Sequence, residues 1–158
     1  MKFLILALCV AAAMAGPSGD QIAAAKASWN TVKNNQVDIL YAVFKANPDI
    51  QTAFSQFAGK DLDSIKGTPD FSKHAGRVVG LFSEVMDLLG NDANTPTILA
   101  KAKDFGKSHK SRTSPAQLDN FRKSLVVYLK GATKWDSAVE SSWAPVLDFV
   151  FSTLKNEL

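Results

Sequence analysis

Residues 69–89 read PDFSKHAGRVVGLFSEVMDLL. The apolar residues of this stretch recur at intervals of three and four, a spacing that places them on one face of an α-helix. That face comprises Phe71, Ala75, Val78, Phe82, Val85, Met86 and Leu89. Thr68 and Pro69 suit a helix start, because threonine caps the first turn and proline is tolerated at its first position. The stretch therefore predicts one long amphipathic helix that carries His74 on its apolar face.

The same spacing recurs along the rest of the chain, and no alternating strand pattern accompanies it. We therefore expect an all-α protein. The expected helices cover about residues 18–33, 36–46, 48–54, 69–89, 96–109, 115–130 and 136–155. The segment from Ser55 to Gly67 has two glycines and no long apolar face, so we expect a corner or loop there. Pro145 falls inside the last helix and predicts a kink or a later helix start.

The first fifteen residues have the pattern of a secretory signal peptide. Lys2 precedes a short apolar run from Phe3 to Val10, and Ala13-Met-Ala15 forms an A-x-A cleavage sequence. The run is too short for a membrane span, which needs about 20 residues. We therefore expect residues 1–15 to be cleaved and residues 16–158 to form one secreted domain. The only cysteine, Cys9, lies within the expected signal.

Charge and motifs exclude several classes of function. The formal net charge is +3 and the basic residues are scattered, which argues against a nucleic-acid partner. The sequence has no H-x-x-x-H or C-x-x-C zinc pattern, no G-x-S-x-G nucleophile turn and no glycine-rich phosphate loop. Beyond the signal segment, no apolar stretch predicts a membrane span.

His74 and His109 are the only histidines. Two neutral imidazoles on different helices could reach opposite faces of a flat iron cofactor. Each has a simpler explanation when taken alone. A histidine on an apolar face is more often a core residue, and a histidine at a helix C-terminus often complements the helix dipole. The residues alone leave these alternatives open.

Four stretches resemble the globin family when taken in order. Residues 38–48, DILYAVFKANP, resemble the second globin helix and its proline corner, and Phe54-Ser-Gln-Phe57 resembles the phenylalanine pair that follows. Residues 71–78, FSKHAGRV, resemble the helix with the distal histidine, and residues 105–110, FGKSHK, the helix with the proximal one. Residues 56–66 and the signal-bearing N-terminus make the chain most similar to the secreted haemoglobins of midge larvae.

This resemblance implies a globin fold of about seven to eight helices around a pocket for haem b. It implies an extracellular oxygen transporter of haemolymph-type fluid, a monomer or homodimer, that binds O2 reversibly at ferrous iron and also takes CO and NO. His109 is implied as the proximal iron ligand, and His74 as the distal hydrogen-bond donor to O2. The other implied pocket residues are Leu40 and Val78 as distal walls, Phe54 on the porphyrin face, and Phe57, Phe105, Leu118 and Phe121. Arg77 is expected either to pair with a haem propionate, to contact the ligand or to lie on a solvated face.

Two other functions fit the same residues. One is a haem peroxidase or nitric oxide dioxygenase on the globin scaffold, which peroxide or nitric oxide turnover would reveal. The other is a haem-free helical carrier of apolar ligands or an interaction module, which a colourless purified protein would favour. The sequence also departs from vertebrate globins, because a longer segment separates the two histidines. We place the extra residues in the turn-rich stretch 90–94.

Overall fold

The computed structural model describes residues 16–158, which form eight α-helices and one short 3-10 helix with no strand among them. The helices are α2 (Gly19–Asn30), α3 (Gln36–Ala46), α4 (Pro48–Thr52), α5 (Leu62–Lys66), α6 (Pro69–Leu88), η1 (Asp92–Asn94), α7 (Thr95–His109), α8 (Pro115–Ala132) and α9 (Ser137–Lys155). The prediction of an all-α chain is confirmed. The expected signal peptide lies outside the described residues.

Side-chain caps begin several helices, among them α2, α6 and α8, and α6 starts at the Thr68–Pro69 pair that the sequence predicts. At the start of α8, Ser114 and Gln117 form a capping box: the Gln117 backbone N–H donates to Ser114 Oγ at 3.2 Å, and the Ser114 backbone N–H donates to Gln117 Oε1 at 2.9 Å. Ser18 and Gln21 form the same arrangement at α2. Thr68 Oγ1 accepts from the Phe71 backbone N–H at the start of α6. These caps fix the point at which each helix enters the fold.

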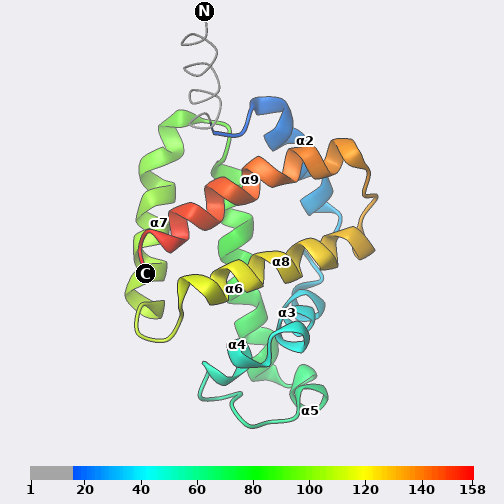
Figure 1. The fold of residues 1–158 in the computed structure, drawn as a ribbon, viewed down its shortest axis with the longest axis vertical. Coiled ribbons are helices and arrows are strands. Elements are labelled where there is room, and N and C mark those ends of the chain that lie inside the picture. The colour runs from blue at the N-terminus through cyan, green and yellow to red at the C-terminus, as the bar shows by residue number, and fades with distance from the viewer. Residues whose placement is uncertain (1–15) are drawn as a thin grey trace, which may run out of the picture.

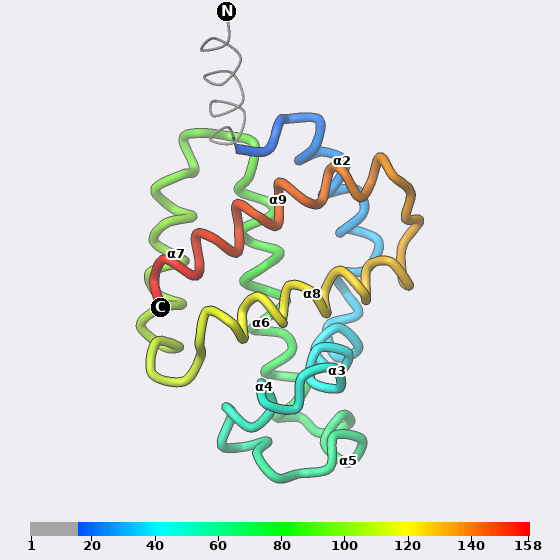
Figure 2. The backbone as a smooth tube through the Cα atoms, in the orientation of Figure 1, coloured from blue at the N-terminus to red at the C-terminus, as the bar shows by residue number. Residues whose placement is uncertain are grey.

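The long helices cross one another in two layers. In Figure 1, α6 runs lengthwise behind α8 and α9, while α7 lies along one side. Helices α3, α4 and α5 gather at one end of the molecule, and the smooth backbone of Figure 2 shows the loop that joins α4 to α5 closing that end. Helix α2 packs on α9, and α3 packs on both α6 and α8. None of the helices in residues 16–158 combines the length and apolar character that crossing a membrane requires.

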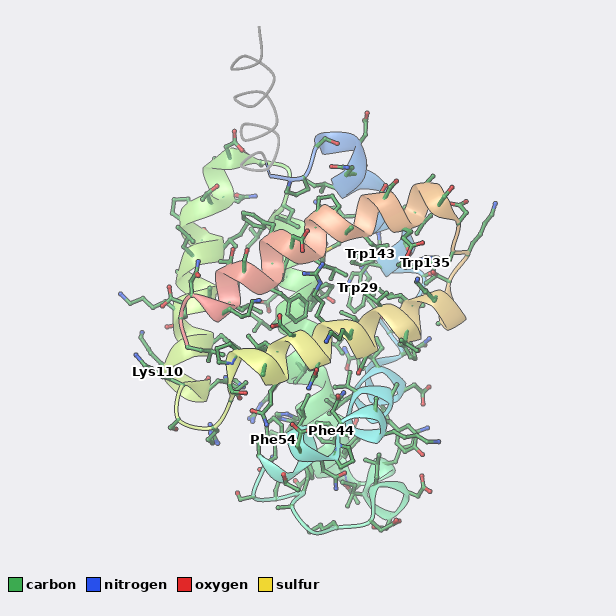
Figure 3. All side chains as sticks on the ribbon, viewed as in Figure 1. Trp29, Phe44, Phe54, Lys110, Trp135 and Trp143 are labelled. Carbon is green, nitrogen blue, oxygen red and sulfur yellow. The ribbon has the colours of Figure 1, made fainter. Side chains whose placement is uncertain are left out.

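Two groups of buried side chains form the core. The larger group centres on Trp29, Phe82 and Trp143, whose rings lie 4.8 to 6.4 Å apart between their centroids. The smaller group, near α4 and α5, centres on Phe44 and Phe71, with ring centroids 5.8 Å apart. In Figure 3, Trp29 of α2 is labelled close to Trp143 of α9, and Phe44 and Phe54 are labelled side by side below α8. The space between the two groups holds the candidate site.

The structure corrects two expectations. The segment from Ser55 to Gly67 is not only a loop, because it contains α5, where Asp61 Oδ2 accepts from the Ser64 backbone N–H at 2.9 Å. Helix α9 starts at Ser137 and continues through Pro145. The prediction that Pro145 could delay the start of this helix is therefore wrong. Proline lacks the N–H that would bond to the Ser141 carbonyl. Gln21 Nε2 donates to that carbonyl instead, at 3.4 Å.

Candidate functional site

A cavity of about 410 Å³ lies between α6 and α7 and is covered by α3, α8 and α9. Most of its lining is apolar and includes Trp29, Phe82 and Val150. Every predicted site residue except Phe57 lines this cavity. They are Leu40, Phe54, His74, Arg77, Val78, Phe105, His109, Leu118 and Phe121. Residues that are up to 81 positions apart in the chain therefore share one space.

His109 is the last residue of α7, and the hydrogen-bond contacts of its ring are at Nδ1. Nδ1 lies 2.9 Å from the Phe105 carbonyl oxygen and 2.8 Å from Ser108 Oγ. Because a carbonyl oxygen can only accept, Nδ1 carries the proton and Nε2 keeps a free lone pair. The Phe105 ring stacks on the imidazole at 4.1 Å. Burial lowers the pKa of His109, which keeps the ring neutral and able to bind a metal.

His74 lies on α6 and also lines the cavity. Its Nε2 is buried and has no hydrogen-bond partner among the described residues. The ring packs edge-on against Phe54, with centroids 4.4 Å apart. The pKa of His74 is lowered to about 4, first by burial and then by the charges of His109, Arg77 and Arg112. The ring is therefore neutral at physiological pH, with a polar atom left unsatisfied beside the cavity.

Phe57 does not line the cavity as the resemblance implies. It is 1% exposed and lies behind the lining, where its ring contacts Phe44, Phe54, Phe71 and His74. Buried Gln51 donates through Nε2 to the Phe57 carbonyl at 3.0 Å and to the Lys60 carbonyl at 2.8 Å. Gln51 thus fixes the loop that carries both phenylalanines, a role for which the sequence has no signal.

The charged residues that line the cavity are both arginines. Arg77 on α6 and Arg112, three residues past the end of α7, are exposed side chains that reach the lining. Arg112 donates to the Ser108 carbonyl, which holds the guanidinium next to the histidine turn. The sequence prediction included Arg77 but missed Arg112 and Ser108. Their closeness to His109 along the chain was the available signal.

These residues fit a haem group. Its flat, largely apolar ring matches the apolar lining, and its two carboxylates match the two guanidinium groups. His109 offers a free Nε2 lone pair, and the buried His74 Nε2 lacks a partner. Two imidazoles are too few donors to hold a bare metal ion, whereas a porphyrin supplies the other four. The donor set therefore suits iron that is already held in a macrocycle.

Comparison with known proteins gives consistent matches. The sequence profile of the Globin family matches residues 37–154. The chain is 99% identical to Globin CTT-I/CTT-IA of Chironomus thummi thummi over 158 residues, covering all of both chains. It is 50% identical to Globin CTT-II beta of the same organism, over 98% of each chain. The structure of a haemoglobin component, TA-VII, of Tokunagayusurika akamusi superposes with a TM-score of 0.86 at 34% identity, covering 91% of this chain and 97% of that one.

Proposed function

The chain belongs to the globin family and is a haem-binding oxygen carrier rather than an enzyme, and from that premise we propose how its own residues divide the work. His109 is the proximal ligand and His74 is the distal hydrogen-bond donor. The observation that carries this proposal is that two neutral imidazoles line one apolar cavity. The His109 ring is held at Nδ1, and the His74 ring has no hydrogen-bond partner at Nε2.

The ferrous iron of haem b supplies the reversible bond to O2 when the group is bound. The task of His109 is to present Nε2 in one orientation. The hydrogen bond from Nδ1 to the Phe105 carbonyl and the stacked Phe105 ring both restrict rotation of the imidazole. A hydrogen bond at the second nitrogen also raises the basicity of a ligating histidine.

His74 acts on the opposite side of the pocket. With haem bound, an N–H donor at this position would stabilise the partial negative charge that O2 acquires on ferrous iron. Nε2 of His74 is free to donate, because no other group on the described chain uses it. Its low pKa keeps the ring neutral, so it donates one proton without placing a full charge in the apolar pocket.

The remaining lining residues control what enters and how the cofactor is held. Leu40, 1% exposed, and Val78 exclude water from the distal side, which slows oxidation of the iron. Phe54 lines the cavity beside His74 and limits the tilt of the ring system. Arg77 and Arg112 pair with the haem carboxylates at the basic edge of the cavity.

The decisive experiment replaces His109 with glycine. The reduced variant is expected to lose its five-coordinate absorption spectrum, and added imidazole is expected to restore it, because the free ligand can fill the space that the side chain leaves. His74→Gly is the matched control and should keep that spectrum without imidazole. If His109→Gly retains normal coordination in the absence of imidazole, the proximal assignment is wrong.

The finer properties are proposals of the same kind. We propose that residues 1–15 are removed and that the carrier is secreted, which the N-terminal sequence of the secreted protein tests by starting at Gly16. CO and NO are proposed to compete with O2 for the same pocket.

The oligomeric state is also a proposal, either monomer or homodimer. The large hydrophobic side chains that are most exposed among the described residues, Leu99 and Val127, lie on different helices, α7 and α8. Sedimentation across a range of concentrations separates a monomer from a homodimer.

A further inference from the structure

Gly106 on α7 lies unusually close to the end of the chain. A Cβ atom at this position would meet the Glu157 carbonyl oxygen at 2.6 Å and Glu157 Cβ at 2.7 Å. Non-bonded carbon atoms pack at about 3.5–4.0 Å, so any side chain would force a backbone to move. Gly80 and Gly131, also within long helices, have nothing within 4 Å of such a Cβ. Among the glycines of residues 16–158, only Gly106 would bring a Cβ within 3.0 Å of another atom.

The segment that Gly106 meets is itself anchored. Past the end of α9, the Glu157 backbone N–H donates to the Leu154 carbonyl and the Leu158 backbone N–H to the Lys155 carbonyl, both at 3.2 Å. Lys155 Nζ forms an ion pair with Asp119 of α8 at 2.8 Å. Leu154 lines the cavity, and Leu158 packs against the larger core group. Figure 2 shows this end of the chain lying against α7.

Gly106 is covalently joined to the group that holds His109. The carbonyl that accepts from His109 Nδ1 belongs to Phe105, and its peptide unit is completed by the Gly106 nitrogen. Because a peptide unit is rigid and planar, a shift of the Gly106 backbone rotates the Phe105 carbonyl as well. The Gly106 carbonyl also accepts from the Lys110 backbone N–H at 2.9 Å, which ties it to the residue that follows the histidine.

We propose that Gly106 is a positioning residue, through which the chain end at Glu157 and Leu158 sets the orientation of the His109 ring. The inference rests on the proposed role of His109 as the iron ligand. The chain end lies against α7 at the position where Gly106 has no side chain. The Phe105–Gly106 peptide links this contact to the hydrogen bond at His109 Nδ1. Displacing the chain end changes how the imidazole is held without removing any group that lines the cavity next to the oxygen ligand.

The test compares Gly106→Ala with the matched control Gly131→Ala in the full, haem-loaded chain. Both substitutions add one methyl group within a helix, but only the first meets backbone. We expect Gly106→Ala to shift the iron–histidine stretching band of the reduced protein and to speed O2 dissociation about fivefold, a size typical of residues that couple to a site without touching its ligand. Hydrogen exchange in the last turn of α7 should also become faster. The control should leave all three unchanged.

A chain that ends at Asn156 supplies the second arm. Removing Glu157 and Leu158 should move the band in the same direction, and adding Gly106→Ala to this shortened chain should have no further effect, because the methyl group then meets nothing. An equal effect of Gly106→Ala in the full and shortened chains would overturn the inference, as would a band that Gly106→Ala leaves in place. A wild-type protein without any iron–histidine band would instead overturn the role of His109.

Discussion

Replacing His74 with leucine should have opposite effects on stability and on oxygen retention. His74 Nε2 is buried without a partner, and its ring lies against Phe54. Leucine has a similar volume and no polar atom, so it removes an unsatisfied group from an apolar pocket. Leaving such a group unpaired costs about 1–3 kcal/mol. We therefore expect the oxygen-free protein to unfold with a free energy about 1 kcal/mol higher after part of this cost is offset by imperfect packing.

Oxygen retention should move the other way. A hydrogen bond to a charged acceptor contributes about 1.5–3 kcal/mol, and each 1.36 kcal/mol changes a rate tenfold. Loss of the His74 donor should therefore speed O2 dissociation about ten- to hundredfold. Dissociation of CO, which carries much less charge, should change far less. His74→Gln is the control, because its amide keeps an N–H donor and should recover part of the slow O2 dissociation.

Stopped-flow mixing with a ligand that replaces O2 measures the dissociation rate, and urea unfolding of the oxygen-free protein measures the stability. The reasoning is refuted if O2 leaves His74→Leu at the wild-type rate. It is equally refuted if the variant is markedly less stable than wild type, since the buried Nε2 would then have a stabilising partner that the structure does not show.

Three further predictions follow from the same contacts. Because burial lowers the pKa of His74 to about 4 while the unfolded ring titrates near 6.5, the unfolded chain takes up its proton first, and the stability present above pH 6.5 falls as the pH drops toward 4. After allowance for partial exposure, urea unfolding at pH 7 and pH 5 should show a loss about 1 kcal/mol larger in wild type than in His74→Leu, where only the smaller contribution of His109 remains. Gln51→Leu leaves the Phe57 carbonyl unpaired and should lower the free energy of unfolding by about 2 kcal/mol; an unchanged urea midpoint would contradict this. Arg77→Ala should speed haem loss about threefold, as expected for an exposed ion pair, with little change in O2 dissociation; an altered O2 rate would instead favour direct contact with the ligand.

The local features of the fold could be predicted because they depend on neighbours in the sequence. The apolar spacing of residues 69–89 gives α6, and the Ser114 capping box gives the start of α8. Most of the cavity lining was also predictable, since the resemblance orders the residues and the helices bring them together. These features need only the helical period and the chemistry of the first turn.

The features that could not be predicted depend on tertiary contacts. Helix α5 is five residues long, too short for an apolar face to appear in the sequence. Phe57 lies behind the lining in a loop whose carbonyls are held by buried Gln51, and no sequence pattern connects the two residues. Pro145 stays inside α9, and Gln21, far away in the chain, donates to the Ser141 carbonyl that proline leaves free. In the last two cases a side chain from outside the local segment binds a carbonyl that the local backbone leaves free.

The cavity between the two core groups also affects how well the newly made chain resists proteolysis. A space of about 410 Å³ is lined by side chains from both groups, so the bound cofactor supplies packing that the polypeptide lacks by itself. A ligand that binds only the folded form shifts the folding equilibrium by mass action. The supply of haem during synthesis should therefore govern how much newly made chain escapes proteolysis. Pulse-chase labelling under haem starvation would show this as a shortened half-life.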